Sequence, residues 1–66
     1  MNYDLLKQMC KERGFSMVDI SLLIDIPKRT FQWQMKNERL SVWKFLEIVD
    51  LLGLTEDEVL KVLNLK

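Results

Sequence analysis

The chain has 66 residues, ten basic and ten acidic side chains, no histidine and a single cysteine. Without histidine there is no imidazole base or imidazole metal ligand, and one cysteine can form neither an internal disulfide nor a zinc site. No apolar run is long enough to span a bilayer, and the first residues lack the pattern of a signal peptide. We therefore expect one cytoplasmic domain, residues 1–66, that uses no cofactor. Because so short a chain has little room for a substrate pocket, we also expect that it is not an enzyme.

The charges are unevenly distributed along the chain, although they sum to zero. Residues 1–26 hold three basic and four acidic side chains, and residues 45–66 hold two basic and five acidic ones. Between them, residues 27–44 carry five basic side chains against Glu38 alone. Nucleic-acid-binding domains concentrate basic residues on one face, so this middle segment is the candidate for a nucleic-acid contact.

Capping residues and helical spacing predict the first two helices. Asn2 can cap a helix over about 3–13, and Gly14 can end it in the left-handed conformation. Ser16, with Asp19 three residues later, can cap a second helix that runs to about residue 24.

A break after the second helix is predicted at Asp25-Ile26-Pro27. Proline disfavours helix in the residue before it but fits the first turn of a helix. A third helix therefore begins at about Pro27 or Lys28, with Phe31 and Met35 turned inward. Asn37 tolerates the left-handed conformation and is expected to end this helix.

Two more helices complete an all-α fold. Ser41 can cap a fourth helix over about 42–52 that stops at Gly53, and Thr55 with Glu58 forms a capping box for a fifth over about 56–64. The inward face of the fourth helix is expected to comprise Val42, Phe45, Leu46, Val49 and Leu52. That of the fifth is expected to comprise Val59, Leu60 and Leu63.

Residues 5–60 resemble the five-helix Cro/CI-type helix-turn-helix domain of phage repressors and related bacterial regulators. The residues that carry the resemblance are Gly14-Phe15-Ser16, Ile20-Ser21, Ile26, Thr30-Phe31, Ile48 to Thr55 and Asp57-Glu58. Their spacing across five helices, rather than any one motif, makes the match specific. The resemblance implies a lambda-repressor-like fold whose helix-turn-helix unit spans about residues 16–37.

The resemblance also implies that the third helix enters the major groove of a double-stranded DNA operator. The family's DNA-contacting positions fall on Ser16, Lys28, Arg29, Thr30, Gln32, Trp33, Lys36 and Arg39. Trp33 leaves two interpretations open, because its indole can either contact DNA or fold inward over Phe31. The implied function is a sequence-specific regulator of phage or mobile-element type that represses by occluding a promoter in a bacterial cell.

Two apolar pairs predict protein contacts. Val18 and Leu22 occupy positions of the second helix that are typically polar in the family. Val62 and Leu65 lie at the C-terminal end, through which family members commonly dimerise, and a homodimer would match a palindromic operator.

An alternative function keeps the same fold but binds another regulatory protein, as an antirepressor or a repressor partner, with weak or no DNA binding. Met17 and Asp25 stand where the family usually has a DNA-fixing glutamine and a turn glycine, which favours this alternative.

Overall fold

The computed structural model describes residues 1–64, which form five helices and, within that range, no strand. The helices are α1 (Tyr3–Glu12), α2 (Met17–Leu23), α3 (Lys28–Lys36), α4 (Val42–Leu52) and α5 (Glu56–Val62). The predicted all-α, five-helix fold is therefore confirmed, with helix ends that agree to within two residues. None of the helices in the described part of the chain has the length and apolar character needed to cross a bilayer.

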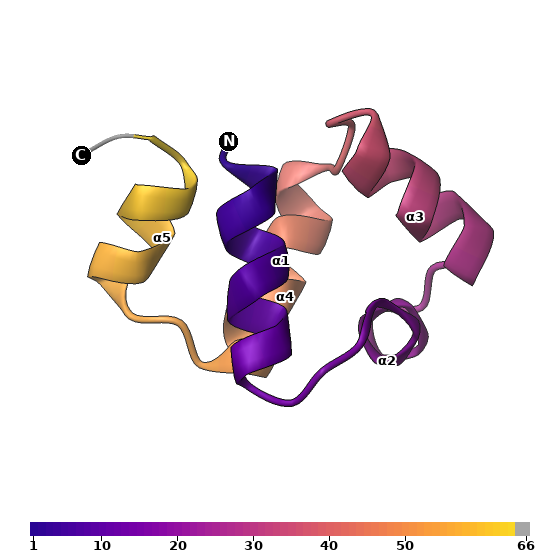
Figure 1. Ribbon diagram of the computed structural model, residues 1–66, viewed down its shortest axis with the longest axis horizontal. Coiled ribbons are helices and arrows are strands. Elements are labelled where there is room, and N and C mark those ends of the chain that lie inside the picture. Colours follow the sequence, from indigo (N-terminus) through magenta and orange to yellow (C-terminus); the bar gives the residue numbers. More distant parts are fainter. Residues whose placement is uncertain (65–66) are drawn as a thin grey trace.

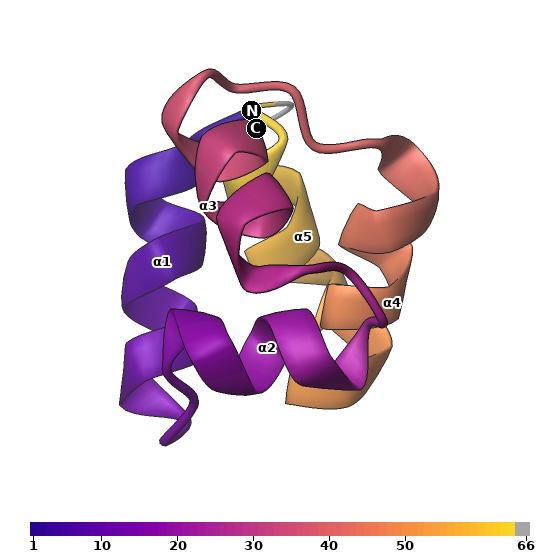
Figure 2. The same ribbon diagram turned by 90° about the vertical axis from the view of Figure 1, so that its right-hand side faces the viewer.

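The five helices are arranged so that α2 and α3 lie at one end of the molecule and α5 at the other, with α1 and α4 between them (Figure 1). Seen from the α2–α3 end, α1 and α4 stand on opposite sides of the molecule (Figure 2). α2 packs against both α1 and α3, and α1 also packs against α5. This arrangement leaves the outer side of α3 at a free end of the fold.

The helix starts follow from local capping. The Asn2 side chain accepts from the Leu5 amide at 3.0 Å, and the Ser41 hydroxyl accepts from the Lys44 amide at 3.2 Å. The predicted capping box at Thr55–Glu58 is complete, and Ser16 with Asp19 forms a complete box as well. α3 starts differently, after Pro27, whose φ of −55° already suits a helix and which supplies no side-chain cap.

The core joins all five helices. Its buried apolar members are Leu6, Met9, Cys10, Ile20, Ile24, Phe31, Met35, Leu40, Phe45, Ile48, Leu52 and Val62. Phe31 and Met35, four residues apart on α3, are buried as predicted. They hold α3 against the core by one face only, so the remaining side chains of this helix are exposed except Gln34, which is half-buried.

Two helices are rotated relative to the sequence prediction. Val42 and Leu46 of α4 were expected to face inward, but they are 65% and 46% exposed, because the core lies on the Phe45–Ile48 side of the helix. On α5 the fully buried residue is Val62, where Asn2 donates its backbone N–H to the Val62 carbonyl. Val59, Leu60 and Leu63, the predicted inward face, are only half-buried.

Four residues with positive φ in the turns bear on the predicted helix ends. Gly14 and Gly53 have φ of 82° and 65°, and Asp25 has φ of 59° between α2 and α3. After α3, however, Asn37 has φ of −97° and Glu38 has φ of 56°. The prediction that Asn37 takes the left-handed conformation was wrong by one residue. Asn37 instead ends the helix by donating its side-chain amide to the Trp33 carbonyl at 2.9 Å.

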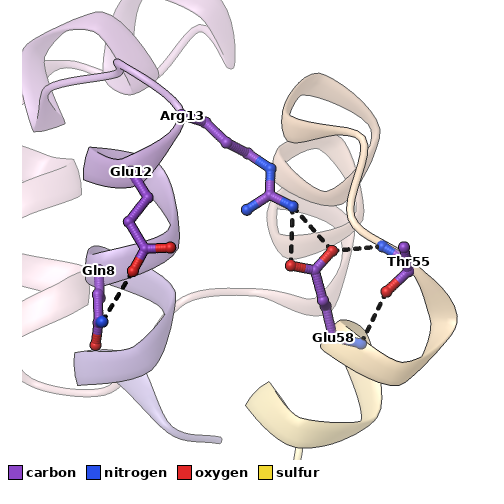
Figure 3. A network of polar contacts seen from close by, with 5 residues as sticks. All are labelled: Gln8, Glu12, Arg13, Thr55 and Glu58. Atoms are coloured by element: carbon purple, nitrogen blue, oxygen red, sulfur yellow. Dashed lines mark hydrogen bonds and ion pairs between the residues drawn. The ribbon is translucent and has the colours of Figure 1, made fainter.

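An ion pair joins the end of α1 to the start of α5, in which one guanidinium nitrogen of Arg13, Nη2, donates to both carboxylate oxygens of Glu58. The Arg13 guanidinium contacts the two carboxylate oxygens of Glu58 at 2.9 and 2.8 Å (Figure 3). The same carboxylate accepts from the Thr55 amide at 2.9 Å, so one side chain serves both the cap and the ion pair. These hydrogen bonds, with that from Thr55 the largest cause, hold the pKa of Glu58 below its ordinary range.

Candidate nucleic-acid interface

The outer surface of α3 carries six of the eight predicted DNA-contacting residues. All six are exposed: Lys28, Arg29, Thr30, Gln32, Trp33 and Lys36. Arg29, Thr30, Trp33 and Lys36 face away from the buried Phe31 and Met35, because successive residues of a helix are turned by about 100°. Gln32 lies on a flank of the helix, and Lys28 is exposed at the edge of this surface because it is the first residue of α3. The fold therefore presents basic, polar and aromatic side chains together on one short helix.

Trp33 is 56% exposed, so its indole does not fold inward over Phe31. On a helical wheel it lies roughly 180° from the midpoint between Phe31 and Met35, at the outermost position of α3. Arg29 and Lys36, four residues before and three residues after it, flank it on the same side. Of the two interpretations of Trp33, the structure excludes the inward-folded indole and leaves the side chain accessible for a contact with DNA.

The cations of this surface form no ion pair within residues 1–64. Lys28, Arg29 and Lys36 lie on a helix without an acidic residue, and Arg39 follows in the connection to α4. The nearby Lys44 differs, because its ammonium contacts Glu47 at 2.9 Å and donates to the Ile24 carbonyl at 2.7 Å. Lys44 thus fastens α4 to the end of α2, while the α3 cations remain available to a ligand.

Arg39 is held by backbone contacts of the connection between α3 and α4. Its amide donates to the Gln34 carbonyl at 2.8 Å, and the next amide, of Leu40, donates to the Tyr3 hydroxyl at 3.2 Å. Leu40 is buried while Arg39 is exposed, so this connection is fixed to the core and displays the arginine beside the end of α3.

Ser16, the eighth predicted contact, lies at the start of α2 and is already engaged by its own helix. Its hydroxyl accepts from the Asp19 amide at 3.1 Å, and its amide donates to the Asp19 carboxylate at 3.0 Å. The hydrogen bond from the Ser16 backbone keeps the pKa of Asp19 below its ordinary range. The hydroxyl and the amide of Ser16 are thus both used in the cap of α2, and the charged Asp19 carboxylate disfavours a phosphate at this helix start.

The predicted protein contacts on α2 are exposed, Val18 by 38% and Leu22 by 74%. Leu23, which the sequence prediction missed, is 57% exposed beside them. A hollow of about 300 Å³ lies next to these side chains and is lined by Gly14, Phe15, Asp19, Leu22 and Leu23. The continuous apolar run Leu22-Leu23-Ile24 indicated this exposure in the sequence, because a short helix cannot bury all three side chains on one face.

A second apolar surface lies on α4, where the sequence predicted core packing. Its members are Val42, Trp43 and Leu46, with Trp43 78% exposed. Spacings of three and four residues place these side chains side by side on the outer face of the helix.

Of the predicted C-terminal surface, only Val62 lies among the described residues. Val62 is fully buried against the rest of the chain, so its side chain is not available to a second protein. Leu65 lies outside the described residues.

Two kinds of chemically reactive group can be assessed in residues 1–64. No group of three or more histidine, cysteine, aspartate or glutamate side chains in that range could hold a metal ion. Burial raises the pKa of the Cys10 thiol to about 11, so this cysteine is a poor nucleophile at neutral pH.

The fold defines the class of protein as a small all-α domain of five helices. Comparison of the chain with known proteins found no matching family model, no matching curated protein and no matching solved structure.

Proposed function

We propose that this protein is a sequence-specific double-stranded DNA-binding regulator of the Cro/CI type that represses by occluding a promoter. The observation that carries the proposal is the outer surface of α3. That surface is exposed, contains Lys28, Arg29 and Lys36 without an acidic residue, and is fixed to the core from behind by Phe31 and Met35. Basic side chains on one rigid helix are the usual means of reaching base edges and phosphates together.

The dimensions of α3 suit a major groove. A helix with its side chains is about 10–12 Å wide, and the groove of B-DNA is about 12 Å wide. The nine residues of α3 extend over about 13 Å, which spans a few base pairs. Lys28 and Arg29 would donate to guanine, Gln32 would pair with adenine, and Lys36 with Arg39 would contact phosphates.

A homodimer remains part of the proposal, because two copies of α3 would meet successive major grooves of a palindromic site. Its interface does not involve the Val62 side chain, which belongs to the core. The molecular mass in solution, with and without a duplex site, tests for the dimer.

The experiment is to enrich binding sites from a random duplex pool and to compare two double variants on the enriched site. Lys28→Ala with Arg29→Ala should weaken binding by at least tenfold, since each removes a base contact worth about 1–3 kcal/mol. The matched control is Lys7→Ala with Lys11→Ala, which removes the same charge from exposed positions of α1. Equal losses in the two double variants would mean that net charge, and not α3, governs binding.

A second function is favoured by one observation, the 74% exposure of Leu22 beside the hollow near Phe15. In this alternative the protein binds another regulatory protein through α2. Leu22→Asp should then abolish the complex while the chain stays folded. Leu46→Asp, at an exposed leucine of α4, is the matched control and should leave the complex intact. If the partner binds the Leu22→Asp variant normally, α2 is not the binding surface.

A further inference from the structure

The outermost part of α3 combines hydrogen-bond donors with an apolar plane. Trp33 lies at its centre, with Arg29 and Lys36 beside it, and no carboxylate occurs anywhere on the helix. The indole, the guanidinium and the ammonium can donate hydrogen bonds but cannot accept them. A DNA base beneath these three side chains must therefore offer acceptors or an apolar group.

The base edges of the major groove differ in what they offer. Adenine and cytosine present amino groups, which need an acceptor, whereas guanine presents two acceptors, N7 and O6. Thymine presents one acceptor, O4, and the C5-methyl, the single apolar group in that groove. An amino group covered by the indole would lose water without gaining a partner, which disfavours adenine and cytosine at that position.

From this surface we infer that Trp33 recognises thymine through its C5-methyl group, with guanine favoured where Arg29 reaches. The inference rests on the proposed function and names the base that its central side chain selects. Gln32 has an amide oxygen and lies on the flank of the helix, so a position that reads adenine is separate from the thymine position.

The experiment uses the full chain and the duplex site enriched from a random pool. Each thymine of that site is replaced in turn by deoxyuridine, which removes only the methyl group. At one position the replacement should weaken binding about fourfold, which corresponds to the ~0.8 kcal/mol of one buried CH₂ group. A 5-methylcytosine–guanine pair at the same position keeps the methyl but presents an amino group in place of O4, and it should also bind less well than the thymine–adenine pair.

Variants assign the methyl effect to one side chain. Trp33→Ala should abolish the difference between thymine and deoxyuridine, and Trp33→Phe should retain it because the apolar plane remains. Trp43→Ala, at the other exposed tryptophan, should also retain it. Circular dichroism verifies that each variant keeps its helical content, which is expected since both indoles lie outside the core.

Two outcomes overturn the inference while leaving the proposed function intact. One is salt-dependent binding to a duplex site at which no replacement of thymine by deoxyuridine changes the affinity. The other is a Trp33→Ala variant that still distinguishes thymine from deoxyuridine. Absence of binding to any duplex would overturn both the proposed function and the inference.

Discussion

The connection after α3 offers a stability test at two adjacent residues. Glu38 has a left-handed backbone with φ of 56°, whereas Asn37 before it has φ of −97° and donates its side-chain amide to the Trp33 carbonyl. An L-residue in the left-handed region is strained, and glycine there is not. We therefore predict that Glu38→Gly stabilises the protein, although glycine ordinarily destabilises a folded chain.

The size of the effect is the balance of two terms. Relief of the left-handed conformation is worth about 1–2 kcal/mol. The greater freedom of glycine in the unfolded chain costs about 0.4–1 kcal/mol. The centres of the two ranges give a net gain of about 0.8 kcal/mol, which raises Tm by about 3–6 °C in a domain of this size. Asp25→Gly should gain less, because aspartate tolerates φ of 59° better than glutamate tolerates φ of 56°.

Urea and thermal unfolding followed by circular dichroism measure the change. The matched control is Asn37→Gly, which introduces glycine one residue earlier, relieves no strain and removes the hydrogen bond to Trp33. It should destabilise the protein by about 0.5–1 kcal/mol. If instead Asn37→Gly stabilised the protein and Glu38→Gly destabilised it, the assignment of the left-handed residue to Glu38 would be wrong.

Three further predictions concern the core and the ion pair. Phe31→Ala removes a fully buried side chain and should cost about 3–5 kcal/mol, enough to unfold much of the protein by circular dichroism at 25 °C. The folded pKa of Glu58 lies below its ordinary value of 4.5, so its contribution to Tm should be complete above about pH 5 and be lost as the pH falls through the folded pKa. Glu58→Gln should show a weaker fall in Tm over that range, and an identical fall would exclude this carboxylate as a cause. The buried Cys10 thiol should react with a thiol reagent far more slowly in native buffer than in urea, and equal rates would contradict its burial.

Local signals predicted most of the fold. Helix starts depend on residues within one turn of each other, and Asn2, Ser16, Ser41 and Thr55 each cap a helix where the sequence places a cap. The break before α3 likewise follows from Pro27, whose effect reaches only its neighbours.

Contacts between distant residues were not predictable in the same way. The Arg13–Glu58 ion pair and the hydrogen bond from Lys44 to the Ile24 carbonyl join different helices. The apolar stripe of α4 is wide enough for two orientations, and only its neighbours decide that Ile48 is buried and Leu46 exposed.

The candidate interface was predicted in part. The exposure of Arg29 and Lys36 follows from the inward spacing of Phe31 and Met35, and that of Lys28 follows from its place at the start of the helix; both are local patterns. The capping box that occupies Ser16 was visible in the sequence, but its consequence for phosphate binding depends on where the Asp19 carboxylate lies.

We propose above all that α3, together with Arg39 in the connection to α4, binds duplex DNA through phosphates as well as bases. The most direct test of this claim is the salt dependence of binding to the enriched duplex, measured for the parent chain and for Lys36→Ala with Arg39→Ala. Each lost phosphate contact should reduce the slope of log affinity against log salt by about 0.9. The double variant should therefore have a slope shallower by about 1.8 than the parent chain. A parent slope near zero, or equal slopes for the two proteins, would contradict the claim.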